Sequence, residues 1–389
     1  MKIALIGTTA ESLIQFRKEL INLLHKNGHV VYAFAIDYDD VTKEKVKSFG
    51  AIPVHYCFSR TGLNPFSDVI NTYKLYKILK SLQLDLAFSY FSKPAIFGTL
   101  AAKFARIQKR YAMLEGLGFF FTNSGGQVSL RTKLLKKILV SLYKVSFRHI
   151  ESLILLNADD KRDLLVNEKI QVKKVHILGG IGLNMSDYPY CPPPVEPVSF
   201  IFVARFLQEK GVYEFIEAAK IVKKKFPETH FCMLGHLDLH NPGSLTIERL
   251  NDLKCNNIIE LPGHVDNVQE WLAKASVFVL PSWREGFPRS TQEAMAMGRA
   301  VITSDVPGCR DTVVDGVNGF LIKPRSSHAL AEKMLCFLHQ PELITQMGNA
   351  SHQIALQQFD SSIVNSKLMK ILRVDFENTK SNAVSYTHL

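Results

Sequence analysis

The sequence predicts an α/β fold of two doubly wound parallel-sheet domains. Its 389 residues exceed what one hydrophobic core usually organises, and its 47% hydrophobic and 21% charged residues are typical of a globular protein. Short apolar runs alternate with helical patterns in two successive sets, which the proline-rich segment PYCPPPVEP separates. Two parallel-sheet domains joined by a linker account for these observations.

The first set of elements opens with a strand, KIALIG, a helix from about residue 10 to 27, and a second strand, HVVYAFAI. Further buried strands are expected at DLAFSYF, RYAML and SLILLN. The first turn reads GTTAES and lacks the G-x-G-x-x-G pattern that binds a dinucleotide, whereas Thr8 and Glu11 have the spacing of a capping box. We therefore expect no NAD site.

The second set begins at VSFIFVAR and continues with a helix near 212 to 225 and the strands THFCMLG, NIIEL, SVFVLP, AVITSD and GFLI. The expected organisation is a first domain over 1–185, a linker over 186–198 and a second domain over 199–358. A helix within 359–378 is expected to pack back on the first domain. The tail, 379–389, ends in VSYTHL, which resembles a segment that recurs at artificial ends of assembled sequences, and it is expected to be non-native.

Positive charge is concentrated in the first half of the chain. Residues 1–180 hold 27 Lys and Arg against 14 Asp and Glu, while 181–389 hold 20 against 22. Between 100 and 150 there are ten basic residues and one acid, Glu115. This imbalance predicts an anionic partner for the first half. Because no regular aromatic residues interleave the basic ones, we expect that partner not to be a nucleic acid.

The lengths of apolar runs and the spacing of cysteines indicate the cellular compartment. No run reaches the roughly 18 apolar residues of a membrane span, and the amino terminus is too polar for a secretory signal. The six cysteines show no C-x-x-C spacing, so neither disulfides nor a metal site is expected. These patterns predict a cytoplasmic protein.

Several motifs resemble those of the retaining glycosyltransferases of family 4. RFLQEKG at 205–211 is followed by EGFPRSTQEAMAMGRAVITSDVPG and DGVNGFLIKP in the family's order. FSRTGLNPF, FGTLAAK, LEGLGFF and GGIGLN resemble bacterial enzymes that add N-acetylgalactosamine to diacetylbacillosamine on undecaprenyl diphosphate, and related O-antigen and capsule transferases. The resemblance implies the GT-B fold, in which two Rossmann-like domains face a cleft.

The resemblance also implies roles for charged residues in these motifs of the second half. Arg205 and Lys210 would bind the diphosphate of a nucleotide sugar, where preorganised cations stabilise the leaving group. In the E-x7-E pair, Glu285 would contact the donor sugar and Glu293 the ribose hydroxyls. Main-chain groups around Gly286 would approach the sugar.

The residues between the two glutamates are expected to shape the donor pocket. A helix starting there would offer free N–H groups to a phosphate. Ser290 and Glu293 also have capping-box spacing, so Glu293 has the alternative role of a helix cap. The expected donor-binding segment consists of Gly286, Phe287, Pro288, Arg289, Ser290 and Thr291.

On the acceptor side the sequence departs from the wider family, because Glu115 and Ser92 stand where relatives carry histidine. Glu115 is expected either near substrate hydroxyls or in a salt bridge to Arg110. Thr8, in the first turn, is expected on the acceptor side. Arg17 follows that turn and is expected either at the cleft or as a solvated helix residue. A general base is not required, because retaining transfer in this fold is described as front-face.

The segment QVSLRTKLLKKILVSLYKVSFRH predicts an amphipathic helix. Its expected apolar side consists of Leu130, Leu134, Leu135, Ile138, Leu139, Leu142 and Val145. Its expected basic side consists of Lys133, Lys136, Lys137 and Lys144. Such a helix, with the adjacent FFF at 119–121, is suited to an anionic bilayer surface, and the alternative is packing on the domain core.

Together, these features predict a retaining glycosyltransferase that needs no metal or other cofactor. It would move a sugar, such as N-acetylgalactosamine, from a UDP-sugar to a polyprenyl-diphosphate-linked glycan at the inner face of the cytoplasmic membrane. A GT-B UDP-sugar 2-epimerase is the alternative reaction class, and a basic nucleic-acid-binding protein is a remote one.

Overall fold

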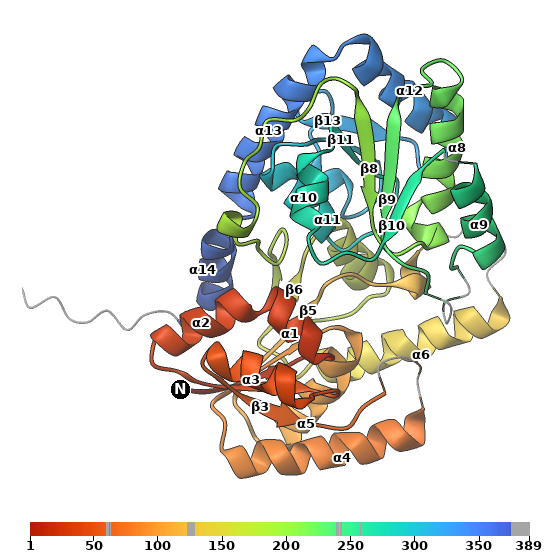
Figure 1. Ribbon diagram of the computed structural model, residues 1–389. Coiled ribbons are helices and arrows are strands. Elements are labelled where there is room, and N and C mark those ends of the chain that lie inside the picture. Colours follow the sequence, from red (N-terminus) through yellow and green to blue (C-terminus); the bar gives the residue numbers. More distant parts are fainter. Residues whose placement is uncertain are drawn as a thin grey trace, which may run out of the picture.

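The computed structural model describes residues 1–59, 62, 64–122, 129–238, 241, 243–256 and 258–374. Within them the chain forms two parallel β-sheets, each covered by helices (Figure 1). The predicted fold class is therefore confirmed. The expected tail, 379–389, lies outside the described residues.

The first sheet has seven strands in the order β3-β2-β1-β4-β5-β6-β7, and every neighbouring pair is parallel. Its strands are β1 Lys2–Ile6, β2 Val30–Ala35, β3 Ala51–His55, β4 Leu86–Tyr90, β5 Lys109–Leu114, β6 Ser152–Leu155 and β7 Val175–Ile177. Its helices are α1 Ala10–Phe16, α2 Lys18–Lys26, α3 Asp40–Ser48, α4 Pro65–Leu82, η1 Pro94–Gly98, α5 Thr99–Phe104, η2 Phe119–Phe121, α6 Leu130–Phe147, α7 Ala158–Lys161 and η3 Arg162–Asn167.

The second sheet has six parallel strands in the order β10-β9-β8-β11-β12-β13. They are β8 Ser199–Val203, β9 His230–Leu234, β10 Glu260–Gly263, β11 Val277–Leu280, β12 Ala300–Ser304 and β13 Gly319–Ile322. The short turns η4 Met185–Asp187, η5 Gln208–Lys210 and η6 Arg310–Thr312 accompany α8 Val212–Lys223, α9 Ile247–Cys255, α10 Val268–Ala273, α11 Arg289–Ala296, α12 Ser327–His339, α13 Glu342–Gln358 and α14 Ser361–Leu372.

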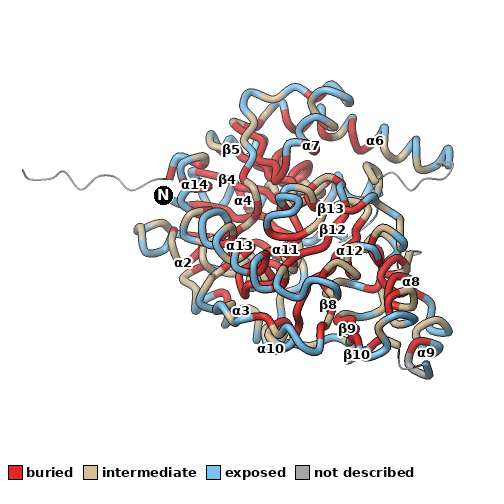
Figure 2. Tube along the Cα trace, turned by 90° about the horizontal axis from the view of Figure 1, so that it is seen from above, coloured by how far each residue is buried: buried red, intermediate tan, exposed pale blue. Residues whose placement is uncertain are grey.

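The strands read as continuous apolar runs because helices cover both faces of each sheet. All five residues of β4 are buried (Figure 2), as are all four of β11. None of the helices in the described part of the chain combines the length and apolar character that crossing a bilayer requires.

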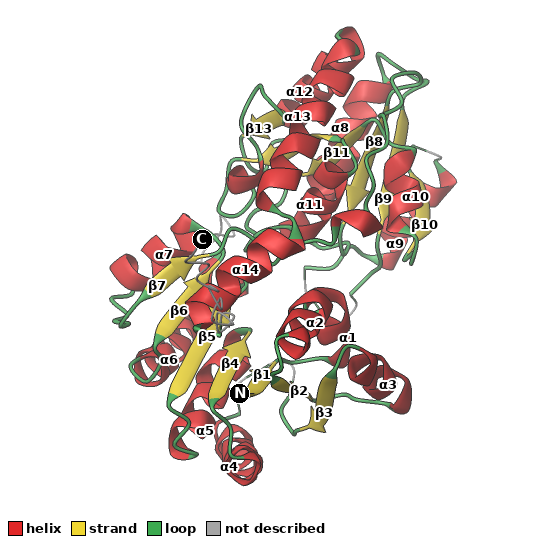
Figure 3. Cartoon of the chain, turned by 90° about the vertical axis from the view of Figure 1, so that its left-hand side faces the viewer, coloured by secondary structure: helices red, strands yellow, loops and turns green. Residues whose placement is uncertain are grey.

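The chain crosses between the two sheets twice, and the two crossings are bonded to each other. Leu183 N–H donates to the carbonyl of Phe359, and Ser361 N–H donates to the carbonyl of Leu183, both at 2.8 Å. α14 then packs against α2 of the first sheet (Figure 3). We call residues 183–188 the hinge segment. Its turn η4 brings Tyr188 back toward the second sheet.

Two local predictions near the amino terminus are wrong. The helix expected from residue 10 to 27 is broken at Arg17, whose φ of −126° and ψ of −3° leave helical geometry. The first helix is capped by Thr9, which accepts a hydrogen bond from Ser12 N–H, and not by Thr8. The break matters for function because it turns the Arg17 side chain into the protein.

Candidate active site

The carboxyl ends of the two sheets face each other, and most of the predicted site residues follow those strand ends. The loop after β5 carries Glu115 and the loop after β11 carries Glu285 and Gly286. A Cβ atom at Gly286 would collide with the carbonyl oxygen of Glu115. The two domains therefore touch at this point, and only glycine permits the approach.

Lys210 and Glu285, which the sequence assigned to the diphosphate and to the donor sugar, form an ion pair with each other. Lys210 Nζ lies 2.6 Å from Glu285 Oε1, and the hydroxyl of Ser282 donates to the same oxygen at 2.8 Å. Gly211 follows at φ 78°, where a side chain would collide with the carbonyl of Pro281. This close approach of the β8 and β11 loops brings the two charges together although they are 75 positions apart.

Arg205 is not part of that pair. Its guanidinium contacts Asp238 at 2.8 Å, and its side chain is 47% exposed to solvent. The two cations expected to share a diphosphate thus each hold a carboxylate of their own. Both ion pairs would have to loosen for a phosphate to be held between them.

The helix after Glu285 starts without a side-chain cap. Pro288 stands at the N-cap of α11 and makes no side-chain hydrogen bond to the helix. Glu293 accepts instead from Arg289 Nε at 2.8 Å and from the hydroxyl of Tyr188 at 2.9 Å. The capping alternative for Ser290 and Glu293 is therefore wrong, and the first-turn N–H groups remain available to an anion.

Other residues of this segment serve packing. Phe287 is buried and packs edge-on against Phe359, with ring centroids 5.4 Å apart, so it does not shape the pocket as expected. Pro288 and Thr291 are buried too, and the hydroxyl of Thr291 has no hydrogen-bond partner among the described residues. Ser290 is half-buried.

Arg17 and Glu115 form a buried ion pair at the carboxyl edge of the first sheet. Arg17 is 2% exposed, and its guanidinium carbon lies 4.4 Å from the ring centroid of Tyr90. Both the solvated alternative for Arg17 and the predicted bridge from Glu115 to Arg110 are wrong. Arg110 instead donates to the carbonyls of His149 and Ile107.

Burial and the neighbouring charge of Arg17 have opposite effects on the pKa of Glu115. Burial raises the pKa of Glu115, and the adjacent Arg17 guanidinium acts in the opposite direction. Within the described residues, neither Thr8 nor Ser92 has a side-chain hydrogen bond to this pair, although both lie just beyond strand ends. Thr8 accepts a backbone hydrogen bond from Ile36 N–H at 2.9 Å.

Arg284, which the sequence patterns did not single out, links the two domains. Its guanidinium forms ion pairs with Asp160 and, at 2.7 Å, with Asp163, and it donates to the carbonyl of Phe121 at 3.0 Å. Beside it, the Asn157 amide donates to the carbonyl of Gly286 at 2.6 Å. The only sequence signal is that Arg284 directly precedes Glu285.

A second cross-domain ion pair, between Arg310 and Asp159 at 2.9 Å, lies next to the Arg284 contacts. Burial raises the pKa of Asp160 to about 6, against the opposing influence of Arg284. These contacts hold the loop that carries Glu285 and Gly286 against the first domain.

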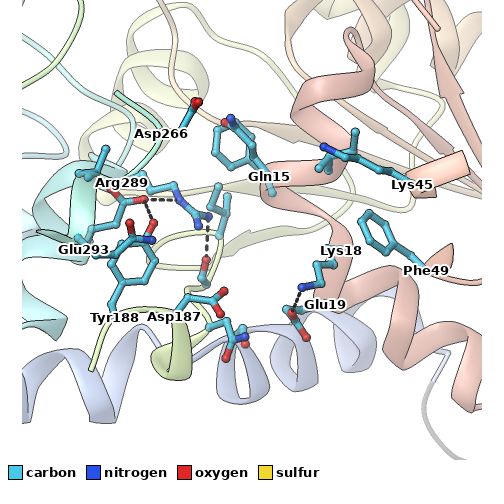
Figure 4. Close-up of a pocket in the computed structure, with 18 of the residues that line it drawn as sticks. Gln15, Lys18, Glu19, Lys45, Phe49, Asp187, Tyr188, Asp266, Arg289 and Glu293 are labelled. Carbon is cyan, nitrogen blue, oxygen red and sulfur yellow. Dashed lines mark hydrogen bonds and ion pairs between the residues drawn. The ribbon is translucent and has the colours of Figure 1, made fainter. Parts of the chain in front are cut away.

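A cavity of about 630 Å³ opens between the domains (Figure 4). Phe16, Lys18 and Lys45 line it from the first domain, and Asp187 and Tyr188 from the hinge segment. From the second domain its lining includes His264 and Asp266 after β10, and Arg289 and Glu293 of α11. Charged and polar side chains thus line the cavity together with apolar ones such as Phe16. It lies next to the free end of α11 and has room for a nucleotide-sized ligand.

Helix α6 forms as predicted, but its buried side differs from the expected apolar side. Leu139 is buried together with Val140, Tyr143 and Phe147. Leu130, Leu134, Ile138 and Val145 are exposed instead, so the core-packing alternative is wrong for them.

The basic side of α6 is only partly free. Lys133, Lys137 and Lys144 are exposed, whereas Lys136 is ion-paired with Glu168 at 2.7 Å and stands 4.4 Å over the ring of Phe121. The exposed leucines and lysines thus share the outer surface of this helix. Across the residues that the structure describes, no group of three or more His, Cys, Asp or Glu side chains is arranged to hold a metal ion.

Two facing Rossmann-like domains with charged loops between them define the GT-B fold, and comparison with known proteins supplies the class of enzyme. The family model described as "Glycosyl transferases group 1" matches residues 192–353. A Campylobacter jejuni relative, N,N'-diacetylbacillosaminyl-diphospho-undecaprenol alpha-1,3-N-acetylgalactosaminyltransferase, is 30% identical over 384 residues, 95% of this chain and 98% of the relative. The chain belongs to the group 1 glycosyltransferase family and is a glycosyltransferase.

Further matches support the same fold and class. UDP-Gal:alpha-D-GlcNAc-diphosphoundecaprenol alpha-1,3-galactosyltransferase of Escherichia coli is 26% identical over 66% of this chain and 67% of the relative. Sucrose-phosphate synthase from Thermosynechococcus elongatus superposes with a TM-score of 0.76 at 17% identity, over 96% of this chain and 98% of that structure. Anabaena HepE, solved in complex with UDP and glucose, superposes with a TM-score of 0.74 at 16% identity, over 96% of this chain and 100% of that structure.

Proposed function

We propose that this enzyme transfers an N-acetylhexosamine, with retention of configuration, from a UDP-sugar to a polyprenyl-diphosphate-linked glycan during the assembly of a surface glycan. The observation that carries the proposal is the Lys210–Glu285 ion pair just ahead of the uncapped start of α11, the helix whose Arg289 and Glu293 line the cavity. The names of the Campylobacter and Escherichia relatives, both acting on undecaprenyl-diphosphate-linked sugars, support the acceptor class.

The donor would lie across the second sheet with its diphosphate at the start of α11. Lys210 and Arg205 would exchange their carboxylate partners for phosphate oxygens, and the free N–H groups near Ser290 would add to them. Glu285, released from Lys210, would accept hydrogen bonds from donor-sugar hydroxyls. Glu293 would accept from the ribose.

The reaction would proceed on one face of the sugar. The bond from the anomeric carbon to the diphosphate breaks as the bond to the acceptor hydroxyl forms, and the acceptor proton passes to the leaving phosphate oxygen. Glu115 is held by Arg17, which suits it to orienting hydroxyls rather than to taking a proton. The cationic side chains stabilise the leaving diphosphate in this scheme.

The membrane-facing surface would be the outer side of the helices α4, α5 and α6, which neighbour one another along the first sheet (Figure 3). On α6 it presents Leu134 and Ile138 beside Lys137 and Lys144. On α4 four apolar side chains spaced for one helix face are exposed: Phe66, Val69, Ile70 and Tyr73. Apolar side chains flanked by lysines fit an anionic bilayer at the inner face of the cytoplasmic membrane.

Calorimetric titration with UDP-N-acetylgalactosamine, UDP-N-acetylglucosamine and GDP-mannose would test the donor class. We expect one UDP-sugar to bind selectively, and Glu293→Ala to weaken it at least tenfold. Product formation would then be followed with that donor and an undecaprenyl-diphosphate-linked sugar. A folded protein that binds none of these donors, or that converts the donor without an acceptor, would contradict the proposal.

A further inference from the structure

Glu293 lies where the hinge segment, α11 and the first domain meet. Tyr188 of the hinge segment donates its hydroxyl to Glu293 Oε1 at 2.9 Å (Figure 4). Arg289 Nε donates to the same oxygen at 2.8 Å, while its guanidinium carbon lies 5.2 Å from the ring centroid of Phe16. One carboxylate oxygen therefore receives both hydrogen bonds.

The other carboxylate oxygen is left for a ligand. A carboxylate oxygen accepts about two hydrogen bonds, so Tyr188 and Arg289 together fill Oε1. Oε2 of Glu293 receives no hydrogen bond from the described residues, and Glu293 lines the cavity between the domains. The geometry thus separates a structural oxygen from a free one.

Tyr188 is itself held in place independently of α11. The turn η4 before it is closed by the Asn184 side chain, which accepts from Ser186 N–H, and Tyr188 N–H donates to the carbonyl of Met185 at 3.2 Å. Burial, and the nearby Glu293, raise the pKa of Tyr188. Its phenol is therefore protonated at neutral pH and always offers a donor to Glu293.

We propose that Tyr188 is a positioning residue that orients Glu293 so that Oε2 accepts a ribose hydroxyl of the nucleotide, which makes the site selective for ribonucleotides. This inference rests on the proposed function, because it takes the cavity as the nucleoside site. It adds that selectivity for ribose depends on a residue outside the E-x7-E segment, in the segment where the chain crosses between its domains.

Titration of wild type, Tyr188→Phe, Glu293→Gln and the double variant with UDP, 2′-deoxy-UDP and 3′-deoxy-UDP would test the inference. We expect wild type to bind at least one deoxy analogue about tenfold more weakly than UDP, the cost of a hydrogen bond to a charged group. Tyr188→Phe should bind UDP about fivefold to tenfold more weakly than wild type does. The ratio of its affinities for UDP and the deoxy analogue should be smaller than in wild type. When Tyr188→Phe is added to Glu293→Gln, the affinity for UDP should fall by less than a further twofold, because Tyr188 acts through Glu293.

Tyr190→Phe is the matched control. Its hydroxyl donates to Asn349 of α13 at 2.7 Å, and Tyr190 is not among the residues that line the cavity, so loss of the hydroxyl should leave UDP binding unchanged. Unfolding midpoints would establish that each variant is folded. If Tyr188→Phe were not, Tyr188→Trp, which keeps a ring but displaces the donor, should show the same dependence on Glu293.

Two outcomes distinguish failure of the positioning role of Tyr188 from failure of the proposed function. If wild type binds UDP but Tyr188→Phe binds it equally well, or if its effect adds fully to that of Glu293→Gln, the positioning role is wrong and the proposed function stands. If wild type binds no UDP, the donor assignment fails and this inference fails with it.

Discussion

The ammonium of Lys210 lies 2.6 Å from a carboxylate oxygen of Glu285, so the two charges predicted to address a donor's diphosphate and its sugar neutralise each other in the free enzyme. The pair is largely shielded from water, with side-chain exposures of 22% and 11%. A donor must therefore divide an existing ion pair rather than meet two solvated charges. Because Lys210 passes from a carboxylate to a phosphate, this partly shielded cation always has an anionic partner.

Replacing Lys210 by methionine should lower kcat by about a hundredfold to a thousandfold, the range for losing one preorganised group that stabilises developing charge. Steady-state kinetics with the UDP-sugar would measure it. Lys220→Met, which removes a half-buried partner of Glu217 on α8, is the control and should change kcat less than twofold. A Lys210→Met enzyme with near-normal kcat would remove Lys210 from the leaving-group site.

Replacing Asp238 by asparagine should free Arg205 from its ion pair. We expect UDP to bind about twofold to fivefold more tightly, because the guanidinium no longer has to leave a carboxylate. The free energy of unfolding should change by less than about 0.5 kcal/mol, since exposed pairs contribute little. Weaker binding of UDP, measured by calorimetry, would show that Asp238 assists the nucleotide instead.

Replacing Arg284 by methionine should destabilise the protein by about 3 to 5 kcal/mol, because it leaves the buried carboxylate of Asp160 without its partner. Denaturant unfolding would measure the change. The double variant Arg284→Met/Asp160→Asn should recover part of the loss. Arg249→Met, which breaks exposed pairs with Glu217 and Asp252, should cost less than about 1 kcal/mol.

Asp160 should make stability fall as the pH rises. Its pKa is about 6 in the folded protein against an ordinary 3.8, so the fold favours the neutral acid. Its contribution is fully present below pH 3.8 and is lost as the pH rises through about 6. By about 1.4 kcal/mol per pKa unit, the loss amounts to roughly 3 kcal/mol.

Comparing unfolding free energies of wild type and Asp160→Asn at pH 5 and pH 7.5 would isolate this contribution. The difference between them should shift in favour of the variant at the higher pH. Asp252→Asn, on the exposed side of α9, is the control for a general carboxylate effect. If the unfolding free energies of wild type and Asp160→Asn differed by the same amount at both pH values, Asp160 would not be the source of the pH dependence.

The double variant Leu134→Glu/Ile138→Glu should abolish sedimentation with vesicles that contain anionic lipid, because it places charge on the exposed apolar part of α6. Phe66→Glu on α4 should weaken it as well. Leu356→Glu, at an exposed apolar position of α13 in the second domain, should sediment like wild type. Binding that survives both first-domain variants would place the membrane surface elsewhere.

The strand-helix alternation and the E-x7-E spacing could be predicted because they depend on neighbours along the chain. Parallel sheets bring their carboxyl ends to one edge, so residues that follow strands, such as Lys210 and Glu285, were bound to approach one another. The elements that the sequence patterns did not assign include β3, α3, α4, α12 and α13. For α6, the 3.6-residue period was visible, but Leu134 and Tyr143 compete for the core, and only packing decided that Tyr143 is buried.

The sequence by itself therefore determined the two parallel sheets, the glycosyltransferase class and the segments that carry the site. Only the tertiary structure decided which polar side chains meet: Arg17 with Glu115, Arg284 with Asp160, and Tyr188 with Glu293. These partners stand 98, 124 and 105 positions apart. Local periodicity carries no information at such separations, because the contacts depend on how two complete domains and their hinge pack together.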